Sequence, residues 1–347
     1  MQHALLRSED QSSDGHTMVD VALSGVTVPE HKVAAVKRGS AGDVRFRALT
    51  LAASVLVLAV FAGVMLSLAM GAAPAIKAFG FDFLTTQYWN PVTEKFGGLA
   101  SIYGTLISSV IAMLLAVPVG IGIAIFLTEI CPRPLRRPIG IAIELLAGIP
   151  SIVYGIWGLF SFAPYFQENI QPWFVDLVAN VPVLQDVFAG PPYGIGIFTA
   201  SFILMIMILP FISAVTRDVF DTVPATLKES AYAMGCTTWE VVWRVVLPFA
   251  RTGVVGGAML ALGRALGETM AVTFVIGNAH HIASSLFAPG TTISATIANE
   301  FTEAVSDLYR ASLIELGLIL FFITFIVLAS AQIMLRALEK RAGGVQG

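Results

Sequence analysis

Six long apolar runs determine what this chain can fold into, because each is long enough to cross a lipid bilayer as a helix. The runs lie at about 48–70, 99–127, 139–161, 194–216, 252–276 and 311–335. Of all residues, 56% are hydrophobic and 12% are charged, whereas a soluble domain carries roughly 25% charged residues. We therefore expect an all-α membrane protein, with six transmembrane helices in a domain covering residues 47–340.

The basic residues indicate how these spans are oriented. Of the 20 Lys and Arg residues, only Lys77, Lys95 and Arg310 fall in predicted outer loops when the amino terminus is placed inside, and Arg264 lies within a span. All the others fall on the inner side, which is where loops of membrane proteins are enriched in Lys and Arg. The sequence thus predicts that both termini are cytoplasmic. Residues 1–46 are polar, and we expect them to form a mobile cytoplasmic tail.

Two charged residues lie in the middle of the predicted fifth span. Arg264 and Glu268 are four residues apart, which would place them on one face of a helix, a turn apart. Charges at this depth are costly in lipid, so both should face protein or water. We weigh two interpretations: a polar lining for the path of an anion, or an internal ion pair that only locks the packing of helices. The glycines at 253, 257, 263 and 267 would let neighbouring helices approach closely.

Other features of the spans are weaker signals. We expect Pro118, with Gly120 and Gly122, to interrupt the second span, and Gly148-Ile149-Pro150-Ser151 to interrupt the third. Such breaks are tolerated where the freed backbone groups meet protein or water. Ser151 and Thr105 could add hydrogen bonds along a path, although small polar residues in spans more often bond their own helix. Glu144 is a further candidate for a buried charge.

Several function classes find no support in the residues. We find neither an H-E-x-x-H motif nor a phosphate-cradling G-x-x-x-x-G-K-[ST] loop, so we expect no catalytic site, no cofactor and no nucleotide site in this chain. Nothing indicates a nucleic-acid partner. His280-His281 could suggest a metal, but no third ligand stands at a recognisable spacing, and a plain outer loop is the better interpretation. Cys131 and Cys236 both fall in predicted cytoplasmic loops, which implies no disulfide.

The cytoplasmic loop 217–251 carries helix signals of its own. Pro224 suits the first turn of a helix, with Thr226 and Glu229 as an alternative start at capping-box spacing. Gly235 suits the position just after the helix end. Thr237 and Glu240 have capping-box spacing again, and Pro248 is expected to close the segment before the fifth span. The loop is therefore predicted to form two short helices joined by a glycine turn.

Part of this loop resembles the EAA loop of ABC-importer permeases. The resemblance lies in Glu229-Ser230-Ala231, then Gly235, and after nine residues Val245-Val246-Leu247-Pro248. The chain departs from the family pattern E-A-A-x3-G-x9-I-x-L-P at Ser230 and Val245. The resemblance implies that the first short helix docks on a cytoplasmic ATP-binding subunit. The residues expected to couple this chain to the ATPase are Glu229, Ala231, Gly235, Leu227 and Pro248.

Together with Gly263–Val272 and Ala147–Gly155, the loop makes residues 45–340 similar to phosphate-importer permeases, and among these to the C-type subunit. That resemblance implies a type I ABC-importer permease in a bacterial cytoplasmic membrane, working by alternating access. It also implies three kinds of partner: a second permease, two copies of an ATPase subunit that binds ATP and Mg, and an extracytoplasmic phosphate-binding protein.

The chemistry of the charged pair suits the phosphate substrate that the resemblance implies. A guanidinium presents a planar fork of donors that matches phosphate oxygens. Arg264 is therefore the expected anion contact, and Glu268 would hold it or weaken binding enough for release. The alternatives are a permease for another oxyanion such as sulfate or molybdate, or an anion channel or carrier that works without ATP.

Overall fold

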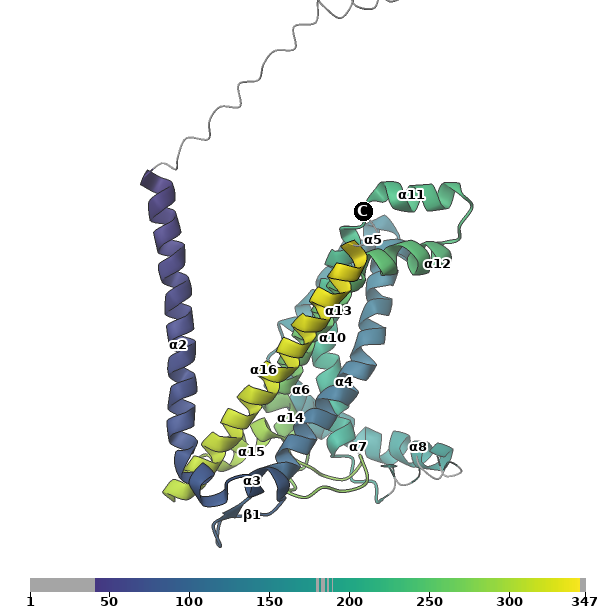
Figure 1. The fold of residues 1–347 in the computed structure, drawn as a ribbon. Coiled ribbons are helices and arrows are strands. Elements are labelled where there is room, and N and C mark those ends of the chain that lie inside the picture. Colours follow the sequence, from purple (N-terminus) through teal and green to yellow (C-terminus); the bar gives the residue numbers. More distant parts are fainter. Residues whose placement is uncertain (1–40, 179–180, 182–184, 186, 189, 344–347) are drawn as a thin grey trace, which may run out of the picture. The chain divides into compact units, whose positions relative to one another are not determined.

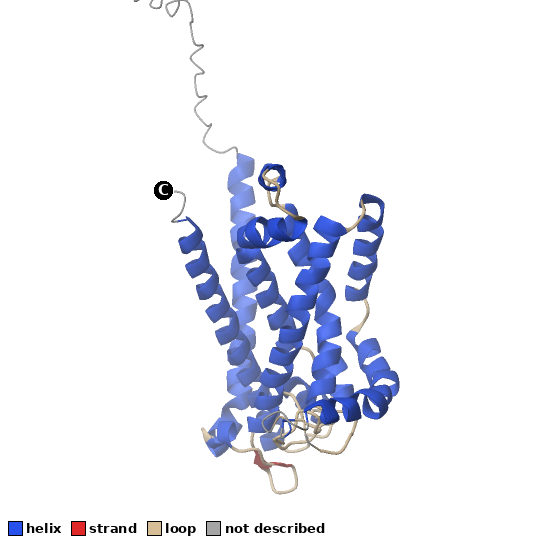
Figure 2. Ribbon diagram, turned by 90° about the vertical axis from the view of Figure 1, so that its right-hand side faces the viewer, coloured by secondary structure: helices blue, strands red, loops and turns tan. Residues whose placement is uncertain are grey.

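The computed structural model describes residues 41–178, 181, 185, 187–188 and 190–343, so most of the predicted tail 1–46 lies outside the described residues. The chain divides into two units, Met1–Gly63 and Val64–Gly347, and helix α2 passes from the first into the second. The described parts are almost entirely helical (Figures 1 and 2).

The helices are α2 (Ala41–Phe79), α3 (Asp82–Thr85), α4 (Leu99–Ile125), α5 (Arg133–Ala147), α6 (Ser151–Trp157), α7 (Ala163–Tyr165), α8 (Gln171–Val178), α10 (Ile197–Asp221), α11 (Ala225–Ala233), α12 (Thr238–Val241), α13 (Leu247–Leu266), α14 (Met270–Val275), α15 (Ile293–Glu300) and α16 (Asp307–Gly343). Four wider π-helical turns adjoin them at Phe126–Ile130, Gly158–Phe162, Phe166–Ile170 and Val242–Val246. Two short antiparallel strands, β1 (Trp89–Asn90) and β2 (Lys95–Phe96), form a hairpin.

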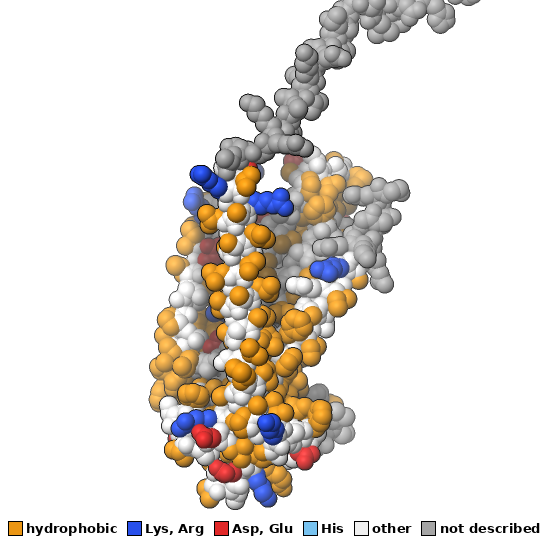
Figure 3. All heavy atoms as spheres, turned by 60° about the vertical axis from the view of Figure 1, so that its left-hand side comes forward, with side chains coloured by type: hydrophobic (Ala, Val, Ile, Leu, Met, Phe, Trp, Pro, Cys, Tyr) orange, Lys and Arg blue, Asp and Glu red, His pale blue; other side chains and the backbone are white. Residues whose placement is uncertain are grey.

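The predicted all-α membrane fold is confirmed. Among the described residues, five helical segments are long and apolar enough to cross a membrane: Gly42–Phe79, Leu99–Ile130, Ile197–Asp221, Thr238–Leu266 and Asp307–Ala337. The pair Arg133–Ala147 and Ser151–Val178, bent by 86°, is either a sixth, broken span or a re-entrant loop. The exposed side chains along α2 are mostly hydrophobic, with Arg45 and Arg47 near its beginning and Lys77 near its end (Figure 3).

Helices α4 and α10 pack closely at the centre of the second unit. The buried face of α4 consists of small residues: Ala100, Ser101, Gly104, Thr105, Ser108, Ser109, Ala112, Ala116, Gly120 and Ala124. A Cβ at Gly120 would lie 2.7 Å from Cγ2 of Ile212 on α10. With no hydrophobic driving force between helices in lipid, such close approach is what makes van der Waals packing effective.

The expectation that Pro118 interrupts the second span is wrong. Helix α4 runs without a break from Leu99 to Ile125, with Pro118 inside it. A proline removes one backbone donor. Here Pro118 lies on the exposed face of α4. The opposite face is buried before and after Pro118, at Ala116 and Gly120. Gly120 is needed for the close contact rather than for a break.

A single carboxylate joins four segments at the end of the unit where the β1–β2 hairpin lies. Glu300, at the end of α15, accepts hydrogen bonds from Trp89 Nε1 and Tyr309 Oη and pairs with His280 Nε2 at 2.9 Å. The Trp89 ring stacks on the His280 ring with centroids 5.4 Å apart. His280 is thus tied to Glu300, and among the described residues no group of three His, Cys, Asp or Glu side chains could hold a metal ion.

The environment of Glu300 favours its ionised form. Burial by itself raises the pKa of this carboxyl, but its hydrogen-bond partners outweigh burial and hold the pKa below its usual value. A carboxyl whose pKa is lower in the folded than in the unfolded protein stabilises the fold at pH values above its unfolded-state pKa. That contribution is lost as the pH falls through its folded-state pKa.

We therefore predict that Glu300→Gln lowers the thermal unfolding midpoint of the purified protein at pH 7, because hydrogen bonds to a charged group contribute about 1.5–3 kcal/mol each. The difference from wild type should shrink as the pH falls through the lowered pKa of Glu300, because the wild-type carboxyl then protonates as well. Glu303→Gln, at an exposed position nearby, is the matched control and should leave the midpoint unchanged. Equal midpoints for the two variants at pH 7 would contradict the role of Glu300.

Candidate functional site

The span that contains Arg264 is broken, contrary to the sequence expectation. We expected a helix over about 252–276, but the continuous helical segment is Thr238–Leu266, and α14 starts again at Met270. Gly267 ends α13 with φ −92° and ψ 0°. Arg264 and Glu268 therefore do not share a helix, and the described structure contains no ion pair between them. No proline marks this break, which is why the sequence did not reveal it.

The break places each charge at a favourable helix end. Arg264 lies in the last turn of α13, next to the partial negative charge of the helix C-terminus. Glu268 precedes α14, and its Oε1 accepts a hydrogen bond of 3.3 Å from the backbone N–H of Ala271. Charges placed this way at helix ends are each stabilised by about 0.3–1 kcal/mol when exposed.

The two side chains differ in what surrounds them. Arg264 is exposed and forms neither a hydrogen bond nor an ion pair with any residue that the structure describes, whereas Glu268 is half-buried. A free guanidinium in a span is not stable against lipid. The exposed side of Arg264 must therefore face water or another protein.

A second broken span packs against the first. Helices α5 and α6 are separated at Gly148–Pro150, where the predicted interruption is confirmed as an 86° bend. The Tyr154 hydroxyl spans this bend and donates to the Leu146 carbonyl oxygen at 2.8 Å. A Cβ at Gly155 of α6 would lie 3.2 Å from the carbonyl oxygen of Met270, so α6 and α14 approach closely. Both breaks contact one core cluster, through Ile149 and Tyr154 on one side and Ala265 and Ala271 on the other.

The remaining pathway candidates lie in different settings. Thr105 is buried, and its hydroxyl both donates to the Ser101 carbonyl oxygen at 2.8 Å and accepts from the Ile293 N–H at 2.9 Å. This hydroxyl ties α4 to the first residue of α15. Ser151 is half-buried at the start of α6, just after the bend. Ser151 therefore lies next to the α5–α6 bend, whereas the Thr105 hydroxyl contributes to helix packing. A role for either residue in transport stays a prediction.

The loop between α10 and α13 contains the two short helices expected, α11 and α12. Helix α11 begins after Pro224, so the alternative start at Thr226 is wrong. It ends in a double hydrogen-bonded turn: Gly235 N donates to Tyr232 O at 2.9 Å, and Cys236 N donates to Ala231 O at 3.2 Å. Gly235 has φ +88°, as expected for the residue after a helix end. The predicted capping box of Thr237 and Glu240 is also confirmed.

Pro248 does not close this segment. It lies in the first turn of α13, inside a helical run that is continuous from Thr238. The preceding turn, Val242–Val246, is π-helical. A wider turn accommodates a residue that has no N–H to donate and whose ring clashes with the carbonyl four residues before it. The loop is therefore joined rigidly to the span that carries Arg264.

The predicted coupling residues on α11 differ in exposure. Ala231 is buried in a cluster with Val241, Val246 and residues of α4 and α10. Leu227 and Glu229 are exposed, and so are Tyr232 and Met234. The exposed surface of α11 therefore offers apolar side chains and one carboxylate, Glu229, that has no ion pair in the described structure.

Two ion pairs at this end were not predicted. Lys228 of α11 binds Glu129, at the end of α4, at 2.6 Å, with the Glu129 side chain only 7% exposed. Arg217 of α10 binds Glu144 of α5 at 2.7 Å. The expectation of a buried charge at Glu144 is wrong, since its side chain is 48% exposed and pairs with Arg217 at the helix surface. The partners are far apart in sequence, and no spacing rule connects them.

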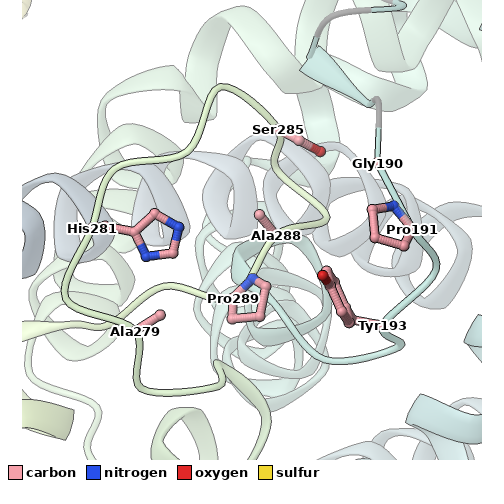
Figure 4. A pocket seen from close by; sticks show the side chains of 8 residues that line it. All are labelled: Gly190, Pro191, Tyr193, Ala279, His281, Ser285, Ala288 and Pro289. Carbon is pink, nitrogen blue, oxygen red and sulfur yellow. The ribbon is translucent and has the colours of Figure 1, made fainter.

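The second unit also contains a cavity of about 410 Å³, away from all the predicted site residues. Gly190, Pro191 and Tyr193 line it from one segment, and residues of the 279–289 loop, including His281 and Ser285, line it from the other (Figure 4). Its lining is mostly apolar, with few groups suited to an anion.

Comparison with known proteins decides the family. Residues 116–344 match the family described as "Binding-protein-dependent transport system inner membrane component". The phosphate transport system permease protein PstC of Mesorhizobium japonicum is 66% identical over 310 residues, covering 89% of this chain and 95% of that protein. The PstC of Pasteurella multocida is 56% identical over 87% of this chain and 94% of that protein. This chain belongs to the PstC family of inner-membrane transport components.

Solved structures agree on the fold of this PstC-family chain. A bacterial ABC transporter involved in the import of the acidic polysaccharide alginate matches with a TM-score of 0.56 at 17% identity, covering 85% of this chain and 98% of that chain. At this identity the match concerns the fold alone. It supports the arrangement of a type I importer permease.

We predict that Gly235→Ala loosens the turn between α11 and α12, because a left-handed conformation costs an L-residue roughly 1–2 kcal/mol. No atom lies within 4 Å of the added Cβ, so strain alone would act. Hydrogen exchange of the Gly235 and Cys236 region should accelerate about 5- to 30-fold. Gly235→Asn should have a smaller effect, since Asn tolerates this conformation. Gly122→Ala in α4, also without neighbours within 4 Å, should not change it.

Proposed function

We propose that this chain is the permease subunit of an ATP-driven importer that moves inorganic phosphate across the cytoplasmic membrane by alternating access. The observation that carries the proposal is Arg264, an exposed guanidinium without a partner at a break between α13 and α14. Relatives that are 66% and 56% identical are named as phosphate permeases, and a guanidinium offers the donors that phosphate oxygens accept.

In this proposal Arg264 is a transient contact for the anion. Broken helices at membrane depth occur where the irregular backbone lines a cavity or is covered by protein. The α13–α14 break packs against the α5–α6 bend through Gly155, so two irregular segments meet near the charge. Glu268 is held at the start of α14 and would limit how tightly an anion binds next to it.

The coupling to ATP would pass through the loop that contains α11. Ala231 packs with Val241, Val246 and Ala250 in one cluster, and the helical run from Thr238 continues without interruption to Leu266. A displacement of α11 is therefore transmitted along α13 to Arg264. The ATP and Mg would be bound by the partner ATPase, and this chain would contribute no catalytic site.

The complete assembly we propose contains a second permease, two ATPase subunits and an extracytoplasmic phosphate-binding protein. The second permease would cover the exposed side of Arg264 together with the translocation path. The α11 end would face the cytoplasm, with both termini on that side, because the Lys and Arg residues are concentrated there.

The substrate is tested by uptake of labelled phosphate into cells or proteoliposomes that contain the whole complex. Unlabelled phosphate should compete, and sulfate and molybdate should not. Competition by sulfate or molybdate at equal concentration would identify another oxyanion as the substrate. Uptake that persists without ATP would instead indicate a channel or carrier.

We predict that Arg264→Gln lowers phosphate uptake about 10- to 100-fold, because a charged hydrogen bond contributes roughly 1.5–3 kcal/mol. The complex should still assemble, since Arg264 has no partner within the described chain. Arg336→Gln, which removes an exposed charge from α16, is the control and should transport normally. Uptake by Arg264→Gln at the wild-type rate would remove Arg264 from the path.

We also predict that Glu229→Lys separates ATP hydrolysis from uptake, or releases the ATPase during purification. Glu229 is exposed and has no ion pair in the described structure, so reversing its charge leaves this chain folded and acts on the partner. Asp221→Lys reverses an exposed charge at the end of α10 and should leave coupling intact. Unchanged co-purification and unchanged phosphate-stimulated hydrolysis would rule out this role for Glu229.

A further inference from the structure

Two tryptophans form an exposed pair on the helical run that follows the Gly235 turn. Trp239 is 68% exposed and Trp243 is 52% exposed, and their rings lie 5.3 Å apart. They are one turn apart, so both rings project from one side of the helix. Both residues lie on the run after α11, and most of the Trp239 surface and about half of the Trp243 surface are exposed.

The buried side of the same run shows the depth at which the pair lies. Val241 and Val246 are completely buried, in a cluster with Ala124 of α4 and Phe220 of α10. These are residues near the ends of two spans, since α4 ends at Ile125 and α10 at Asp221. Figure 1 shows α12 running across this end of the second unit, and Figures 1 and 2 show α11 further from the spans. The tryptophans therefore lie where the apolar spans meet the aqueous side.

Positive charge accompanies the pair. The Arg244 side chain is 76% exposed and forms a long ion pair with Glu240, with 3.9 Å between Nη1 and Oε1. Arg251, at the start of the span, is also exposed. Tryptophan is enriched at membrane interfaces because its ring is apolar and its N–H is polar. Arginine beside it binds lipid phosphate by charge-assisted hydrogen bonds.

We propose that Trp239, Trp243 and Arg244 form a lipid-binding anchor in the headgroup region of the leaflet on the α11 side. The tryptophan rings insert at the boundary between headgroups and acyl chains, and Arg244 binds lipid phosphate. The anchor fixes the height of the joint between α11 and α13 relative to the bilayer. This proposal rests on the proposed function only in one respect, which is that the leaflet on the α11 side is the cytoplasmic one.

Lipid fits this surface better than the ATPase does. Helix α11 lies further from the spans and presents its own exposed apolar residues, Leu227, Tyr232 and Met234. The helical run that carries the tryptophans instead packs, through Val241 and Val246, on residues near the ends of α4 and α10, so we place it closer to the lipid headgroups than α11.

The test measures tryptophan fluorescence of the complete complex in lipid nanodiscs. The signal of the pair is obtained by subtracting the fluorescence of the Trp239→Phe/Trp243→Phe variant from that of wild type, which removes every other tryptophan. Quencher groups attached near the lipid headgroup should remove roughly half or more of this difference signal, and aqueous iodide much less, as for side chains at the interface. Quenchers at the end of the acyl chain should have a smaller effect.

Two results would overturn the proposal. If headgroup-level quenchers left the difference signal unchanged while iodide quenched it fully, the pair would face water. If iodide reached the pair only after the ATPase subunits had been removed, the pair would belong to an ATPase contact. The charge is tested with Arg244→Gln: wild type should be quenched more by labelled phosphatidylglycerol than by labelled phosphatidylcholine, and the variant should lose that difference. Both lipids carry a phosphate and differ in net charge, so equal quenching by the two in wild type would exclude the expected preference of Arg244 for anionic headgroups.

Discussion

A charge inside a bilayer must be compensated by something other than lipid, and this requirement explains the arrangement around Arg264. The end of α13 supplies part of the compensation, because unpaired carbonyl groups there favour a cation. The start of α14 does the same for Glu268. The rest has to come from beyond the chain, since Arg264 is exposed within it. The broken helix is therefore the reason that two charges are tolerated, and it leaves the exposed side of Arg264 to be compensated by water or by another protein.

Helix α13 connects the charged site to the loop that contains α11. One end carries the charge, and the other continues through a π-helical turn into the loop that contains α11. Lys228 and Glu129 hold α11 to the end of α4 by a largely buried ion pair. Such a pair is costly to break by removing one partner. The loop is thus attached both to the end of the second span, through the Lys228–Glu129 pair, and to α13, which carries Arg264.

The sequence predicted the parts of this architecture that depend on local chemistry. The six spans follow from hydrophobicity, the bend before α6 from Pro150, and the ends of α11 and α12 from Gly235 and the Thr237–Glu240 pair. The sequence-based predictions were wrong where contacts between helices determine whether a span is continuous. Pro118 looked like a break but is held in a continuous helix by α10, whereas the break at Gly267 carries no proline. The ion pairs of Glu129 and Glu144 join residues that no local pattern connects.

Dividing the fifth span has a mechanical consequence. Helix α14 is locked to α6, since a Cβ at Gly155 would lie only 2.8 Å from Phe274. Helix α13 meets α16 more loosely, with 3.4 Å from a Cβ at Gly263 to Leu328 and 3.9 Å from one at Gly256 to Leu335. Against α10, however, α13 packs closely, since a Cβ at Gly253 would lie 2.6 Å from Val219 and one at Gly257 2.6 Å from Val215. The two halves of the span are thus held by different helices, α14 by α6 and α13 by α10. A shift of α6 relative to α10 would therefore act at Gly267 and change what the Arg264 guanidinium, one turn away, faces.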